Sequence, residues 1–194
     1  MDSAVLLFTT RGYAATSVRE IVEMAGVTKP ALYYHFESKE GIYLAILDDL
    51  VRIADEGIAA SRVATGTARE RLEGFLLGIY ELFETRKAWV RMINAVFWGP
   101  AQGVPPFDFE TFHQKLMAVI SEIVGEGIAA GELRNADPGD VTLALMGVLS
   151  FNMDLDLAHP ELGLGRDGLR RVLDLIFSGL AAPAPTPTYQ ETSR

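Results

Sequence analysis

The chain has 194 residues, a formal net charge of −9 and no cysteine. Apolar residues make up 49% of the sequence, which is enough for a substantial core, and the lack of cysteine excludes a disulfide framework or a thiolate metal site. No signal-peptide pattern occurs, and the longest nearly apolar run, residues 141–151, is too short to cross a bilayer. We therefore expect a soluble cytoplasmic protein that does not bind a membrane.

A short helix is predicted over residues 18–25. Ser17 and Glu20 have the S-x-x-E spacing of a capping box, and Gly26 stands where a left-handed cap would end the helix. The apolar residues of this segment recur at i, i+3, i+4 and i+7 and so form one face: Val18, Ile21, Val22 and Ala25. A helix with this pattern packs one side against a core.

A second short helix follows, with Thr28 as its N-cap and Pro30 in its first turn. Leu32 and Phe36 form its inward face, and Ser38 is the N-cap of a third, longer helix. The other faces carry side chains that suit a recognition helix in the major groove: Lys29, Ala31, Tyr33, Tyr34 and His35. The pattern predicts a helix-turn-helix DNA-binding domain over residues 1–47, and a surface or core role for single aromatics is the alternative.

Each polar side chain of this predicted helix has a specific use at DNA. Lys29 can donate to guanine acceptors or to phosphate, Ala31 can touch a thymine methyl, and tyrosine or histidine can bind phosphate oxygens. Residues 1–47 hold four basic and five acidic side chains, so this domain is near neutral. Its DNA affinity must therefore depend on a few placed cations, on helix N-termini and on binding as a dimer.

Helical periodicity continues through residues 48–181, and no strand pattern stands out. Thr67 and Glu70 form another capping box, and Asp137-Pro138 marks the start of a further helix. The tail at residues 182–194 is rich in proline and is expected to be disordered. From residue 39 onward, we expect helices over residues 39–60, 67–83, 88–98, 107–130, 138–157 and 166–180. The first of these connects the predicted DNA-binding domain to the rest of the chain.

The last two predicted helices carry more apolar surface than one core needs. The final helix has a stripe at Leu169, Val172, Leu173, Ile176, Phe177 and Leu180. The helix before it is apolar on several sides, with Val141, Leu143, Leu145, Val148 and Phe151. Residues 141–151 and 169–180 are therefore expected to form a homodimer interface of four helices. The alternative is that both helices complete a monomeric core.

Aromatic and methionine side chains are dense in the middle of the chain and suit an apolar effector cavity. The expected ligand-binding residues are Phe75, Tyr80, Trp89, Met92, Phe97, Phe112 and His113, with ordinary core packing as the alternative. The G-x-G-x-x-G match at residues 163–168 joins two helices, which excludes a dinucleotide site. Asp154, Asp156 and His159 are interpreted as a solvated helix end. We expect no cofactor, no metal site and no enzymatic activity.

The ordered motif resembles the TetR (tetracycline repressor) family of bacterial transcriptional regulators. The residues that carry the resemblance are Leu7-Phe8, Gly12-Tyr13, Thr16-Ser17-Val18, Ile21, Ala25-Gly26-Val27-Thr28, Leu32-Tyr33, His35-Phe36 and Ser38-Lys39. The resemblance implies an all-α homodimer, with an N-terminal three-helix helix-turn-helix domain and a C-terminal helical domain that dimerises and binds a ligand. It also implies DNA contacts by Ser17, Arg19, Thr28, Lys29, Pro30, Ala31, Tyr33 and Tyr34, with His35 and Lys39 on phosphate.

The chain departs from this family at its start, where Met1-Asp2-Ser3 takes the place of the usual basic stretch, so the arm is absent or the true start lies upstream. The hypothesis favoured by the motif is a repressor that binds a palindromic double-stranded DNA operator as a dimer and is released by a small hydrophobic or aromatic effector. The alternative is a helical small-molecule binding protein with weak or lost DNA binding.

Overall fold

The structure, a computed structural model, describes residues 1–97 and 103–179, and within these ranges all regular structure is helical. The all-α prediction is thereby confirmed. The predicted tail at 182–194 and the end of the last predicted helix at Leu180 lie outside the described residues. In chain order the helices are α1 (Asp2–Arg11), α2 (Val18–Ala25), α3 (Lys29–Phe36), α4 (Lys39–Val63), α5 (Ala68–Thr85), α6 (Lys87–Phe97), α7 (Phe109–Ala129), α8 (Pro138–Ala158) and α9 (Gly165–Ser178).

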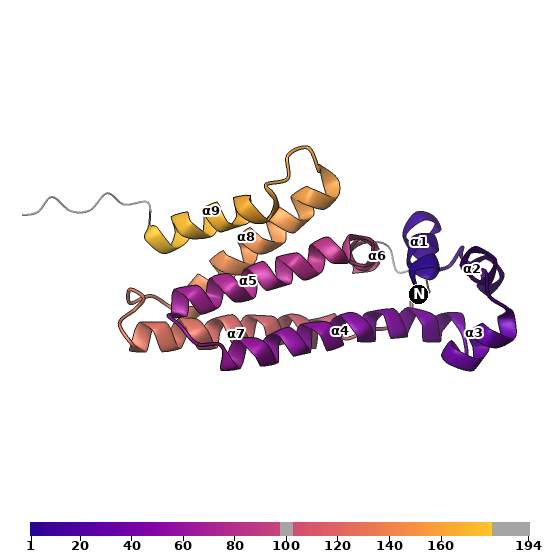
Figure 1. The fold of residues 1–194 in the computed structure, drawn as a ribbon, viewed down its shortest axis with the longest axis horizontal. Coiled ribbons are helices and arrows are strands. Elements are labelled where there is room, and N and C mark those ends of the chain that lie inside the picture. Colours follow the sequence, from indigo (N-terminus) through magenta and orange to yellow (C-terminus); the bar gives the residue numbers. More distant parts are fainter. Residues whose placement is uncertain (98–102, 180–194) are drawn as a thin grey trace, which may run out of the picture.

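The helices form an elongated molecule with α1, α2 and α3 at one end (Figure 1). The helix α4 has 25 residues, about 37 Å at 1.5 Å per residue, and extends from that end alongside α5 and α7 (Figure 1). Helices α5, α7, α8 and α9 form the opposite part, and α6 lies between it and α1. Both α4 and α6 contact the N-terminal helices.

The predicted caps are confirmed. Ser17 and Glu20 make both bonds of a capping box, and the Thr28 hydroxyl accepts from the backbone N–H of Ala31. Gly26 has the left-handed conformation (φ 65°, ψ 29°), which turns the chain from α2 into α3. The predicted helix over 39–60 extends to Val63, and the other predicted helix ends within the described residues lie at most two residues from the observed ones.

The two capping-box carboxylates make stability depend on pH. The pKa of Glu20 is lowered, first because the Ser17 backbone N–H donates to the carboxylate and then because the Ser17 hydroxyl does. Thr67 lowers the pKa of Glu70 in the same way. A lowered folded-state pKa contributes stability that is present above the unfolded value and is lost as pH falls. We expect the free energy of unfolding to decrease between pH of about 5 and pH of about 3.

Denaturant titrations at several pH values measure this dependence. The Glu20→Gln/Glu70→Gln double variant should show a flatter decrease than the wild type, because neither cap can then be lost by protonation. Glu84→Gln removes an exposed carboxylate of α5 outside both caps and should leave the slope unchanged. Equal slopes in all three proteins would contradict the role of the caps.

Two hydrophobic cores occur within the described residues. The C-terminal core is formed by α5, α7, α8 and α9 together with Ile58, and includes Leu72, Leu76 and Ile120. The N-terminal core lies among α1 to α4 and includes Phe8, Leu32 and Tyr43. It also takes in Trp89 and Met92 from α6, which are 5% and 1% exposed. The DNA-binding domain predicted at residues 1–47 is therefore completed by side chains from a later helix.

The helix α9 is fixed against α5 by three arginine–carboxylate pairs. Arg170 Nε lies 2.9 Å from Glu73, Arg166 Nε lies 2.7 Å from Glu81, and Arg69 pairs with Asp174. This attachment leaves the outer sides of α8 and α9 uncovered, where Leu143, Phe151 and Leu175 are 66%, 70% and 55% exposed. We call these three residues the α8–α9 surface. By length and composition alone α8 is also apolar enough to cross a membrane.

Candidate nucleic-acid interface and ligand cavity

The exposed sides of α2 and α3 bring together most of the residues predicted to bind DNA. Ser17, Arg19 and Thr28 are exposed at the first turns of the two helices. On α3, Tyr33 is 46% exposed and Tyr34 is 85% exposed, whereas Leu32 is buried beneath them at 5%. The remaining exposed members of the predicted set on this helix are Lys29, Pro30, Ala31 and His35. This surface presents donors and aromatic edges from a helix whose opposite face is firmly packed.

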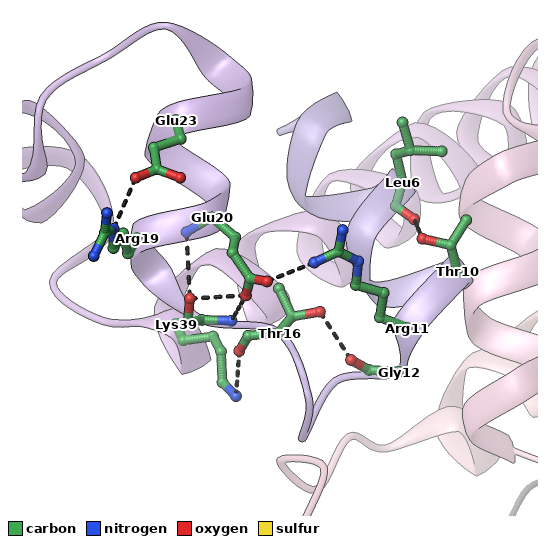
Figure 2. A network of polar contacts seen from close by, with 10 residues as sticks. Leu6, Thr10, Arg11, Gly12, Thr16, Arg19, Glu20, Glu23 and Lys39 are labelled. Atoms are coloured by element: carbon green, nitrogen blue, oxygen red, sulfur yellow. Dashed lines mark hydrogen bonds and ion pairs between the residues drawn. The ribbon is translucent and has the colours of Figure 1, made fainter.

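The basic side chains of residues 1–47 differ in how they are paired. Arg11 lies 2.5 Å from the Glu20 carboxylate, and Arg19 Nε lies 2.7 Å from that of Glu23 (Figure 2). Lys29, at the start of α3, has no hydrogen-bond or ion-pair partner within residues 1–97 and 103–179. Lys29 is therefore the cation most available to an incoming anion on this surface.

Lys39 has a different environment from the phosphate contact that the resemblance implies. Its ammonium group donates to the carbonyl oxygens of Tyr13 and Thr16, both at 2.9 Å, and lies 4.3 Å from the centroid of the Tyr13 ring. Because these acceptors already engage the ammonium group, Lys39 ties the start of α4 to the connection between α1 and α2. We assign it a positioning role.

Replacing Lys39 should therefore reduce stability. We expect Lys39→Met to lower the free energy of unfolding by about 1–3 kcal/mol, because it removes hydrogen bonds from a charged donor and leaves carbonyl groups without it. Chemical denaturation measures the loss. Lys29→Met is the matched control, since Lys29 is exposed and has no partner, and it should unfold as the wild type does. Equal stability of the two variants would contradict the positioning role.

A cavity of about 250 Å³ lies among α4, α5, α6, α7 and α8. Its polar lining residues are Asn94, His113, Ser150 and Asp154, of which the last three are exposed. Within the described residues no lysine or arginine lines it. The rest of the lining is mostly aliphatic and aromatic and includes Leu47, Leu50, Ile79, Phe83, Val90, Ile93, Phe107, Phe112, Leu116, Met146, Leu149 and Met153. Such a cavity suits a small apolar ligand.

The predicted ligand-binding residues are distributed over three places. Phe112 and His113 line the cavity. Phe75 and Tyr80 belong to the C-terminal core, and Trp89 and Met92 to the N-terminal core, where neighbouring side chains already occupy their surroundings. Burial raises the pKa of Tyr80, and the hydrogen bond that its hydroxyl donates to Asp156 raises it further. The side chain of Phe97 lies outside the described residues.

The helix α6 connects the cavity with the N-terminal core. Trp89 and Met92 belong to that core, whereas Val90 and Asn94 line the cavity. Ile93 lines the cavity and also packs against the N-terminal core. The sequence analysis missed Val90 and Ile93 as lining residues. The sequence does indicate this arrangement, because adjacent apolar residues occur twice, at positions 89 and 90 and at positions 92 and 93. Such pairs give one short helix a wide apolar surface that can contact two neighbours.

Comparisons with known proteins agree with this geometry. Residues 1–46 match the model of the bacterial regulatory proteins, tetR family. The HTH-type transcriptional repressor KstR2 of Mycolicibacterium smegmatis is 30% identical over 138 residues, which are 69% of this chain and 65% of that protein, slightly under two thirds of its length. KstR2 of Mycobacterium tuberculosis is 30% identical over 142 residues, 69% of this chain and 67% of that protein. A putative fatty acid metabolism regulator of Clostridium perfringens has the same fold, with a TM-score of 0.74, 22% identity and coverage of 94% and 98% of the two chains.

Proposed function

Because this chain belongs to the tetR family of bacterial regulatory proteins, we propose that it is a ligand-responsive transcriptional repressor of the cytoplasm. It binds a palindromic double-stranded DNA operator as a homodimer and is released by a small apolar effector. The observation that carries the proposal is the exposed face of α3, which displays Lys29, Tyr33 and Tyr34 over the buried Leu32.

At DNA, α3 enters the major groove and α2 crosses the phosphate backbone. Lys29 and Ala31, in the first turn of α3, meet base edges or the nearest phosphate. Ser17 and Thr28 cap the two helices, so the N-terminal dipoles of α2 and α3 are available to phosphate at the same positions. Tyr33, Tyr34 and His35 complete the surface with further donors.

The homodimer forms through the α8–α9 surface. Large exposed apolar patches on a soluble domain mark interaction sites, and an isologous interface buries the same patch from both subunits. This pairing presents two copies of α3 to half-sites about 34–36 Å apart, one turn of the DNA helix. The apolar character of α8 is thereby explained by a protein partner.

The effector acts through α6 and α4. A ligand in the cavity contacts Val90 and Ile93 on α6, and the same helix holds Trp89 and Met92 in the N-terminal core. Leu47 and Leu50 of α4 likewise belong to the N-terminal core and line the cavity. The effector shifts the dimer away from its DNA-binding arrangement only to the extent that it binds the other arrangement more tightly.

Lys29→Ala tests the DNA-binding part of the proposal. Fluorescence titrations with the duplex upstream of the protein's own gene, at several salt concentrations, should show weaker binding and a salt slope lower by about one for each lysine that contacts a phosphate. Arg134→Ala is the control, because Arg134 is an exposed cation between α7 and α8, remote from α3. It should leave both quantities unchanged.

Two other outcomes would change the conclusion. Wild-type titrations that coincide with those of Lys29→Ala would remove Lys29 from the interface. A wild-type protein that binds apolar ligands but no DNA would support the alternative, a helical small-molecule binding protein with lost DNA binding, which the pairing of Arg11, Arg19 and Lys39 within the chain favours.

A further inference from the structure

The exposed side of α2 carries an arginine and a glutamate that form an ion pair with each other. Arg19 Nε donates to the Glu23 carboxylate at 2.7 Å, and the side chains are 76% and 60% exposed (Figure 2). The hydrogen bond to Glu23 raises the pKa of Arg19. A pair this exposed contributes little to stability, because solvent screens the attraction.

The neighbouring Glu20 shows what a structural carboxylate looks like in the same helix. Glu20 accepts from the Ser17 backbone N–H at 2.8 Å, completes the cap of α2 and also binds Arg11. Within the described residues, the Glu23 carboxylate has Arg19 as its one partner, and it takes no part in the N-terminal cap of α2. Glu20 therefore has a structural role in capping α2, whereas Glu23 has no such role.

The position of this ion pair on α2 means that Glu23 can affect DNA binding. Arg19 lies in the first turn of α2, the helix that crosses the phosphate backbone in a helix-turn-helix complex. A phosphate that binds the free Nη groups of Arg19 must share the guanidinium with the Glu23 carboxylate, which already occupies Nε and offsets the positive charge.

We propose that Glu23 restrains Arg19 and so weakens sequence-independent binding to phosphate. This inference rests on the proposed DNA-binding function. Phosphate contacts carry almost all of the nonspecific affinity, whereas base contacts distinguish sequences. A restraint on one phosphate contact therefore lowers binding to random DNA while the contacts of α3 with base edges are kept.

Glu23→Gln tests the restraint with a duplex of random sequence as the probe. We expect tighter binding by about two- to fivefold for each DNA-bound subunit, the range that corresponds to releasing one exposed ion pair. The salt slope should become steeper by about one for each Arg19 that then neutralises a phosphate. The effect should nearly disappear in the Arg19→Gln background, because the carboxylate then has no guanidinium to restrain.

Glu56→Gln is the matched control. Glu56 forms an i,i+4 ion pair with Arg52 on α4 at 2.6 Å, and the two side chains are 65% and 58% exposed, respectively. Glu56→Gln changes the net charge by the same amount as Glu23→Gln. It should leave DNA binding unchanged. A Glu23→Gln titration that coincides with that of Glu56→Gln would overturn the inference while the wild-type affinity upheld the proposed function. An equal gain in the Arg19→Gln background would also overturn it, since simple repulsion would then explain the result. Absence of DNA binding by every variant and the wild type would overturn the inference and the proposed function together.

Discussion

Phe151→Glu is expected to convert the proposed dimer to a monomer and to abolish tight operator binding. Phe151 is 70% exposed at the α8–α9 surface, and a carboxylate there would be buried without a partner in an apolar interface. A monomer has only one copy of α3 to bind a half-site, so the affinity for the operator should fall by a factor of at least about 100. Sedimentation velocity and DNA titration on the same sample measure both effects.

The control for this substitution is Val63→Glu. Val63 is 79% exposed at the end of α4, so the change adds the same charge to a similarly exposed apolar position away from the α8–α9 surface. It should remain dimeric and bind DNA as the wild type does. A dimeric Phe151→Glu protein would show that this surface does not hold the subunits together.

Trp89→Ala should have the largest effect on stability. Trp89 is 5% exposed in the N-terminal core, and Arg86 lies 4.7 Å from its ring, so truncation leaves a large cavity beneath the helix-turn-helix. We expect a loss of about 3–5 kcal/mol in the free energy of unfolding. Hydrogen exchange should show that the amides of α1, α2 and α3 lose protection first.

Leu149→Ala distinguishes this effect from general destabilisation. Leu149 is 1% exposed in the C-terminal core and lines the cavity. Its truncation should lower stability by about 2–5 kcal/mol without preferential exchange in α1 to α3. If Trp89→Ala and Leu149→Ala give the same exchange pattern, α6 is not a specific support of the N-terminal helices.

Local features of the sequence predicted the helices well, because capping depends on residues that are three or four positions apart. Ser17 with Glu20, Thr67 with Glu70 and the glycine at 26 each define a helix end without any tertiary contact. The same locality made the exposed face of α3 predictable, since Leu32 and Phe36 determine which side is buried.

The cavity was less predictable, because composition shows which residues are apolar but not which of them face each other. Trp89 and Val90 are adjacent in sequence, yet one lies in the N-terminal core and the other in the cavity wall. Lys39 presents the same difficulty. Its carbonyl partners Tyr13 and Thr16 are more than 20 positions away, so no local pattern distinguishes this contact from one with phosphate.

The glycines at 163–168 have a structural explanation in the connection between α8 and α9. A Cβ at Gly163 would lie 1.8 Å from a carboxylate oxygen of Asp156, so only glycine fits beside this buried side chain. A Cβ at Gly168 would lie 2.3 Å from that of Leu164, and Gly165 has a positive φ of 63°, so the three glycines have structural reasons that need no bound dinucleotide.

The central claim is that two copies of α3 in one symmetric dimer read DNA. Selection of bound duplexes from a random pool by the wild-type protein, followed by sequencing, tests it most directly. We predict an inverted repeat whose half-site centres lie about 34–36 Å apart. Enrichment of sites without two-fold symmetry, or of no sequence at all, would contradict the claim.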